Sequence, residues 1–256
     1  MTRAVALEAL PPGDFRPGGG IVHTVMLLNP KGGSGKTTIA TNLAAFYARQ
    51  GHQTALFDHD AQGSSTQWLR VRSDDAPPIH GVAAYRNPIG MTRTWQLRVP
   101  HSAERLVVDT PAGLKQPHLA SLVRTADTII IPVLPSPIDM DAVAAFTSDL
   151  HRVRPGCKHA VRIGVVINRV PAKGTGVERM ERVLVDLGLD VVARLRDSRL
   201  YPRASALGES IFDLVGRRVY SGVGDWEPLL DWLEPGRHRA RSQGSESLPT
   251  QAAASA

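Results

Sequence analysis

A glycine-rich turn between an apolar strand and a helix constrains this chain more than any other feature. The apolar run at residues 21–28 leads into NPKGGSGKTTIATN, residues 29–42, where a helical pattern begins. Such a turn gathers backbone N–H groups at a helix N-terminus, where the helix dipole also attracts a polyphosphate. The spacing lets Lys36 reach the β- and γ-phosphates and lets the Thr37 hydroxyl sit on Mg²⁺. The segment is therefore predicted to bind nucleotide phosphates.

The amino-acid sequence of this loop departs from the general phosphate-loop pattern GxxxxGK[ST] in two ways. The chain has Pro30 where the pattern has glycine, and it carries an additional lysine at position 31. KGGSGKTT resembles the deviant Walker A motif of the ParA/MinD group of ATPases. In that family the additional lysine touches the phosphates bound by the partner subunit, so the resemblance makes Lys31 catalytic in trans, whereas otherwise it is a solvated loop lysine. The predicted phosphate-binding residues are Lys31, Gly32, Gly33, Ser34, Gly35, Lys36, Thr37 and Thr38.

A second polar segment, DHDAQGS, ends the apolar run at residues 54–58 and continues beyond it. Carboxylates at the carboxyl end of a parallel strand point into the crevice where open α/β sheets bind ligands. The segment resembles the DxDPQxS switch region of the same family, with Ala61 in place of proline, a change that makes the loop less rigid. The resemblance implies that Asp60 orients the attacking water near the metal, with Asp58 and Gln62 in support. The alternative is a turn whose Asp and Gly residues serve only its own backbone.

A third segment, LVVDTPAG, places Asp109 at the end of an apolar run. This is the Walker B arrangement, in which the carboxylate holds Mg²⁺ directly or through water. Because Mg²⁺ keeps most of its waters, a single protein carboxylate suffices. The predicted metal-binding residues are Thr37, Asp60 and Asp109, and the predicted catalytic residues are Lys31, Lys36 and Asp60.

Three later segments extend the resemblance over roughly residues 21–233. IPVLPSPID, which ends at Asp139, looks like the PxxPSxxD stretch of the smaller ParA-type proteins. Asn168 follows the apolar run at residues 162–167, and relatives use an Asn there to contact adenine, so we expect it to recognise the base. The alternative is an Asn that caps a strand end. The resemblance is weaker at residues 201–213, which in the family often sit near the dimer or the nucleotide.

Apolar β-branched runs alternate with helical patterns along the chain. This alternation predicts an α/β fold, a mostly parallel doubly wound sheet flanked by helices, of the deviant Walker A type of P-loop NTPase. A flexible extension at 1–20, an ATPase domain at 21–235 and a disordered tail at 236–256 are expected. Strands are expected at residues 22–28, 54–58, 105–109, 128–132, 162–167 and 191–195, with a weaker one at 79–85. Helices are expected at residues 37–50, 64–71, 139–152, 177–187, 200–207 and 225–233.

Composition narrows the cellular setting. The chain has 256 residues and is 42% hydrophobic, but no apolar run approaches the length of a membrane span. Its N-terminus is not a convincing signal peptide, and one cysteine, Cys157, excludes an internal disulfide framework. We therefore expect a cytoplasmic protein. The net charge of +6 is carried mostly by arginine, which fits contacts with DNA phosphates but also fits a GC-rich genome.

The resemblance implies an ATP-dependent homodimer that binds nucleoid DNA without sequence preference. Slow, Mg²⁺-dependent ATP hydrolysis, stimulated by an adaptor protein bound to a cargo, would act as a timer. The cargo could be a plasmid, a chromosome region, a carboxysome or a protein cluster. The candidate DNA-contacting residues are Arg199, Arg203, Arg217, Arg218, Arg237, Arg239 and Arg241.

Three alternatives lack their sequence signatures, and a fourth is disfavoured by residues that are present. A MinD-like membrane-associated positioning ATPase, the nearest rival, needs an amphipathic C-terminal helix, and the residues after Glu234 show no such pattern. A nitrogenase-iron-protein-like reductase needs cluster-binding cysteines in each subunit. A bacterial tyrosine kinase needs a C-terminal tyrosine cluster, yet the last tyrosine is Tyr220. A module that only holds nucleotide needs neither Asp60 nor Asp109.

Overall fold

The computed structural model describes residues 22–86, 100, 102–114, 116–153, 160–172, 176–214 and 221–235. The expected extension and tail lie outside the described residues, as do Cys157 and five of the seven candidate DNA-contacting arginines. Among the helices that are described, none is both long enough and apolar enough to cross a bilayer.

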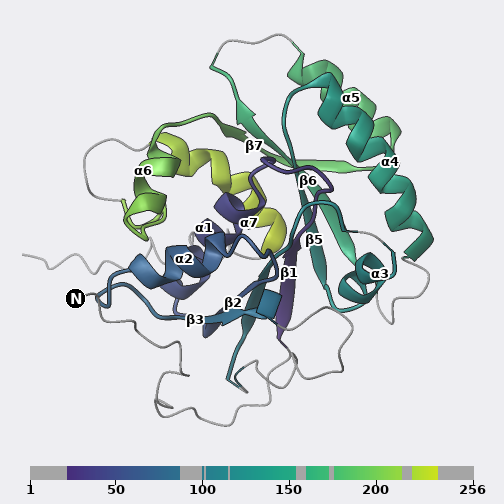
Figure 1. Ribbon diagram of the computed structural model, residues 1–256. Coiled ribbons are helices and arrows are strands. Elements are labelled where there is room, and N and C mark those ends of the chain that lie inside the picture. Colours follow the sequence, from purple (N-terminus) through teal and green to yellow (C-terminus); the bar gives the residue numbers. More distant parts are fainter. Residues whose placement is uncertain are drawn as a thin grey trace, which may run out of the picture.

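Seven strands form one sheet, and every neighbouring pair is parallel (Figure 1). The strand order is β3-β2-β4-β1-β5-β6-β7, so the first strand lies in the middle. The predicted α/β class is confirmed, and the sheet is parallel throughout. The strands are β1 (His23–Leu27), β2 (Thr54–Asp58), β3 (Ile79–Ala83), β4 (Arg105–Asp109), β5 (Thr128–Val133), β6 (Arg162–Val170) and β7 (Asp190–Arg196).

Helices cover both faces of the sheet. In Figure 1, α3, α4 and α5 lie on one side, and α1, α2, α6 and α7 lie on the other. This double cover explains why several strands are apolar along their whole length rather than at alternate positions. The helices are α1 (Lys36–Arg49), α2 (Ser64–Val71), α3 (His118–Val123), α4 (Pro137–Val153), α5 (Val177–Asp186), α6 (Leu200–Ala206) and α7 (Glu227–Leu233).

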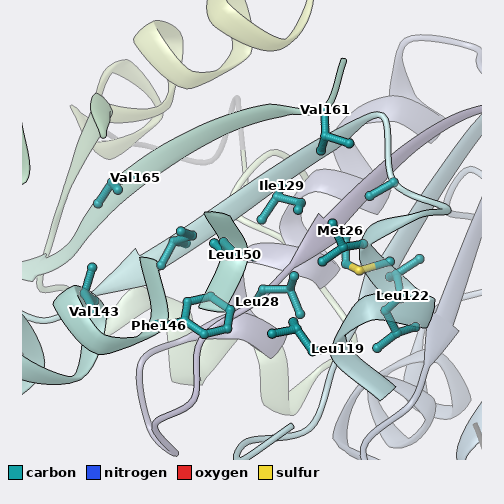
Figure 2. Close-up of a cluster of buried hydrophobic side chains, with 14 of the residues drawn as sticks. Met26, Leu28, Leu119, Leu122, Ile129, Val143, Phe146, Leu150, Val161 and Val165 are labelled. Carbon is teal, nitrogen blue, oxygen red and sulfur yellow. The ribbon is translucent and has the colours of Figure 1, made fainter. Parts of the chain in front are cut away.

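Successive residues of the central strand face opposite layers of the core, as the period-two geometry of a strand requires. Met26 and Leu28, two residues apart and therefore on the same face, pack with Phe146 of α4 in one buried cluster (Figure 2). Val25 and Leu27 belong to the second cluster, under α1 and α7. Strand β1 is thus fixed from both sides, and the loop that follows it begins from a rigid point.

The sequence predicted most of the helices and strands, but it misplaced the residues at which some of them end. Strand β6 continues to Val170 instead of ending at 167, with register shifts against β7, so Asn168 lies inside the strand and not beyond it. The strand expected at 79–85 ends at Ala83 and turns into a 3₁₀ helix, Ala84–Arg86. Helix α3 was not predicted, because six residues are too few to show a helical period.

The segment at residues 207–213 connects the helices on one face. Arg72, directly after α2, donates hydrogen bonds to the Gly208 carbonyl (3.0 Å) and to the Asp213 carboxylate (3.0 Å). Burial raises the pKa of Asp213, but the hydrogen bonds from Arg72 and Ser210 outweigh it and leave the pKa below its ordinary value. A mostly buried ion pair thereby attaches this segment to α2.

We expect Asp213→Asn to lower the free energy of unfolding by about 2–3 kcal/mol at pH 7, because it leaves the buried Arg72 guanidinium without its charged partner. A lowered folded-state pKa contributes stability above the unfolded pKa, and that stability is lost as pH falls through the folded value. The gap between wild type and variant should therefore narrow below about pH 3.8. Urea unfolding across pH measures this. Asp149→Asn, which breaks the exposed pair with Arg152, is the matched control and should cost less than about 0.5 kcal/mol.

Candidate nucleotide-binding site

The glycine-rich loop runs from the end of β1 into α1, and Lys36 occupies its centre. The Lys36 side chain turns back to donate hydrogen bonds to the carbonyls of Asn29 (3.1 Å) and Lys31 (3.0 Å). Burial lowers the pKa of Lys36, while the carboxylates of Asp109 and Asp60 oppose that shift. Its ammonium group is therefore held inside the loop, on the side of the two carboxylates that the sequence associates with the metal and the attacking water.

The loop is anchored to its neighbours by residues that the sequence reasoning did not select. The Asn29 amide donates to the Pro132 carbonyl of β5 (2.6 Å), and its oxygen accepts the Lys31 N–H (2.7 Å). On the other side, the Gly113 N–H donates to the Pro30 carbonyl (2.8 Å). The only hint of this role in the sequence is that Asn29 is the first polar residue after the apolar run.

Lys31 lies at the rim of the loop and is paired within its own chain. Its ammonium group contacts the Asp139 carboxylate of α4 at 3.0 Å, and the Lys31 side chain is one-third exposed. The Ser136 hydroxyl donates to the same carboxylate oxygen. The other oxygen of Asp139 is buried and has no hydrogen-bond partner among the described residues. The PxxPSxxD stretch thus contacts the additional lysine directly.

Two carboxylates lie at the carboxyl end of β2, Asp58 in its last position and Asp60 just beyond it, and they have different surroundings. Asp58 is buried, and Thr66 donates to it from both its N–H (2.8 Å) and its hydroxyl (2.9 Å). Burial raises the pKa of Asp58, and the donors from Thr66 and the Asp60 N–H act against the rise. Asp60 is only half-buried, and the Gln62 N–H donates to it at 2.9 Å. Asp58 therefore fixes the loop, while Asp60 remains accessible from the site.

Asp109 ends β4 and is completely buried. The Ser65 hydroxyl donates to its Oδ2 at 2.6 Å, whereas its Oδ1 has no hydrogen-bond partner among the described residues. Burial raises the pKa of Asp109 to about 7, and the Ser65 hydrogen bond, the neighbouring Thr37 hydroxyl and the charge of Lys36 oppose this rise. A buried carboxylate oxygen with an open coordination position, beside the Thr37 hydroxyl, fits the hard oxygen ligands that Mg²⁺ prefers.

Asn168 lies against the loop in this structure. Its amide donates to the Ser34 carbonyl (2.9 Å), and its oxygen accepts the Arg169 N–H (3.0 Å). Arg169 has a φ of 55°, so the strand bends at this position. Because both polar atoms of Asn168 are used by the backbone, its contact with adenine stays a prediction.

The remaining loop residues are arranged for backbone contacts. Gly32 and Gly33 are exposed, Ser34 is buried, and Thr37 and Thr38 are half-buried at the start of α1. Asn42, one turn further along α1, donates to the Thr38 carbonyl (2.7 Å) and accepts the Ile211 N–H (2.8 Å). Sequence reasoning missed Asn42, since a polar residue in an apolar helix gives no sign of its distant partner.

Comparison with known proteins identifies the family of the chain. Residues 25–211 match the model of the CobQ/CobB/MinD/ParA nucleotide binding domain. The chain belongs to this family.

Individual relatives cover most of the chain. Its sequence is 31% identical to maintenance of carboxysome distribution protein A from Gloeobacter kilaueensis, over 85% of this chain and 97% of the relative. The protein of the same name from Halothiobacillus neapolitanus is 29% identical over 83% and 96%. The chromosome-partitioning ATPase Soj from Thermus thermophilus is 27% identical over 64% and 76%.

Solved structures share the fold at low sequence identity. A plasmid partition protein from Borrelia burgdorferi, bound to AMPPNP, aligns with a TM-score of 0.66 at 16% identity, over 84% of this chain and all of that one. MinD from Pyrococcus horikoshii, in complex with Mg-ADP, aligns with a TM-score of 0.65 at 15% identity, over 84% and 96%. These structures confirm the fold, and the family match over residues 25–211 confirms the predicted resemblance to the ParA/MinD group.

Gly35 gives a direct test of the loop geometry. It has a φ of 98°, and a Cβ there would lie 2.1 Å from the Asn168 amide nitrogen. We expect Gly35→Ala to weaken nucleotide binding at least about tenfold, because backbone strain and the clash together cost more than about 1.4 kcal/mol. Gly224→Ala, outside the predicted site, is the matched control, since a Cβ at Gly224 meets nothing within 4 Å. Equal affinities of the two variants for a fluorescent ATP analogue would contradict the geometry.

Proposed function

We propose that this chain is a ParA-type ATPase that positions an intracellular cargo on the nucleoid. The observation that carries the proposal is the meeting of Lys36, Asp60 and Asp109 at the ends of three neighbouring strands, β1, β2 and β4. Holding a nucleotide needs the lysine and the backbone N–H groups, whereas hydrolysis also needs carboxylates for a metal and a water. The similarity to proteins named for carboxysome distribution and chromosome partition gives further support.

The chemistry is positioning and charge neutralisation. Lys36 and the loop N–H groups stabilise charge that develops on the γ-phosphate, and Asp60 orients the attacking water. Thr37 and Asp109 would hold Mg²⁺, which neutralises charge on the β- and γ-phosphate oxygens. Turnover is slow as long as the site lacks Lys31 from a second subunit, and an adaptor protein accelerates it.

Lys31 is suited to act across a dimer. Its side chain is one-third exposed at the rim of the loop, where it is paired with Asp139 of its own chain and remains accessible to a second subunit. In its own subunit, the central position among the loop carbonyls belongs to Lys36. A triphosphate on a second subunit offers Lys31 more negative charge than Asp139 does. ATP would therefore favour the homodimer.

Arginines on and beside α6 support a DNA-binding role. Arg199 and Arg203 are both exposed. Among the described residues, Asp213 is paired with Arg49 and Arg72 rather than with either of them. The arginines at 217, 218, 237, 239 and 241 lie outside the described residues. We propose that these arginines bind DNA phosphates without reading sequence, and that dimerisation joins two such patches into one surface.

The proposed setting is cytoplasmic, with the dimer associated with the nucleoid. An adaptor protein bound to the cargo stimulates ATP hydrolysis and so releases the dimer from DNA. The similarity to proteins named for carboxysome distribution favours a carboxysome as the cargo, and the similarity to Soj leaves a chromosome region as the alternative.

The first test concerns turnover and the dimer together. Lys36→Ala should abolish Mg²⁺-dependent ATPase activity, whereas Asp60→Ala should keep ATP binding but block turnover and so trap the dimer. Adding Lys31→Ala to the Asp60→Ala protein should return it to monomer, because the contact in trans is lost. Sedimentation with ATP and with ADP measures both states. Wild-type hydrolysis by Asp60→Ala, or an unchanged dimer in the double variant, would refute the assigned roles.

The second test concerns DNA. The ATP-bound protein should bind random-sequence duplex more tightly than the ADP-bound protein, and its affinity should fall steeply with salt, because phosphate contacts release counterions. The double variant Arg199→Ala and Arg203→Ala should weaken binding several-fold at every sequence. Arg152→Ala, an exposed arginine on α4, is the control. Equal affinity in both nucleotide states, or an affinity insensitive to salt, would exclude DNA as the track.

A further inference from the structure

Two neighbouring residues of α2 hold two neighbouring carboxylates at the ends of β2 and β4. Asp58 and Asp109 are register partners in these parallel strands. Thr66 donates to Asp58, and Ser65, the preceding residue, donates to Asp109. Ser65 is completely buried, so its hydroxyl has no access to water. The first turn of α2 therefore determines how both carboxylates are oriented.

The two carboxylates are left in different states. Both oxygens of Asp58 are occupied, Oδ1 by the Asp60 N–H (3.1 Å) and Oδ2 by Thr66. Asp109 has Oδ2 occupied by Ser65, while Oδ1 is buried without a hydrogen-bond partner among the described residues. A buried carboxylate oxygen without a partner is costly unless a ligand completes it. Only Asp109 is therefore prepared to accept a cation.

From this difference we infer that Ser65 is a positioning residue for Mg²⁺: it fixes Asp109 so that Oδ1 faces the metal position beside Thr37. The inference rests on the proposed ATPase function and adds a residue to that site. Ser65 is the second residue of a helix whose N-cap, Gly63, makes no side-chain cap. A serine early in a helix often caps the N-terminus, and here the hydroxyl is directed instead to a strand. Outer-shell donors of this kind orient the ligand and typically change metal affinity by about 10- to 100-fold when removed.

The experiment compares ATP binding with and without metal. In wild type, a fluorescent ATP analogue should bind more tightly with Mg²⁺ than with EDTA. In Ser65→Ala, the Mg²⁺ concentration that gives half of the gain in analogue binding should rise about tenfold. The affinity for the analogue in EDTA should stay within about twofold of wild type. Mn²⁺ bound to the ATP complex, followed by electron paramagnetic resonance, gives a second readout independent of turnover. Ser65→Cys, which retains a weak donor, should lie between the two.

Two controls separate positioning from general loosening. Gln67→Ala changes an exposed side chain in the same helical turn and keeps the hydroxyls of Ser65 and Thr66, so it should leave the Mg²⁺ dependence close to wild type. A thermal melt of each variant checks the fold. An unchanged Mg²⁺ requirement in Ser65→Ala, or an equal shift in Gln67→Ala, would overturn the role of Ser65 alone. A wild-type protein whose ATP affinity does not respond to Mg²⁺ would overturn the proposed function as well.

Discussion

All seven strands run in one direction, and this constraint brings the polar groups of the site together. In a parallel sheet the carboxyl ends of all strands meet at one edge, so the loops after β1, β2, β4 and β6 converge there. The strands are buried on both faces, which leaves their ends as the places where polar groups are tolerated. Lys36, Asp58 and Asp109 are all buried at this edge, and each is held by hydrogen bonds from the loops or from α2. The same geometry that buries the strands therefore creates the polar edge.

Helix α2 joins this edge to the segment at residues 207–213. Its first turn holds the carboxylates through Ser65 and Thr66, and Trp68 donates from its indole to the Glu209 carbonyl. Gly208 lets the segment approach the end of α2 closely, because a Cβ at this position would lie 2.4 Å from the backbone nitrogen of Arg72. Helix α1 contacts the same segment through Asn42. Hydrogen bonds therefore connect the segment after β2 to residues next to α6, which carries one of the exposed arginines.

The sequence predicted what depends on local pattern and missed what depends on distant partners. Alternating apolar runs and helical patterns were enough for the α/β class, and the motif spacing located Lys36, Asp60 and Asp109. The path of β6 past Asn168 depends on register shifts against β7, which no local pattern records. Asn29 and Ser65 act through partners on other strands, so their roles appear only when the chain is folded. Tertiary hydrogen bonds, rather than propensity, account for these differences.

The pairing of Lys31 with Asp139 explains how one lysine could report the nucleotide state. Lys31 is one-third exposed whereas the Asp139 carboxylate is buried, so the pair holds Lys31 at the rim of the loop. In the proposed homodimer, a triphosphate bound to the second subunit would compete with Asp139 for the same ammonium group, and such a difference in affinity is what a shift in population requires. When Lys31 leaves, the buried Asp139 keeps the Ser136 hydroxyl as its donor. Asp139 therefore retains one hydrogen bond from its own helix start in the proposed dimer.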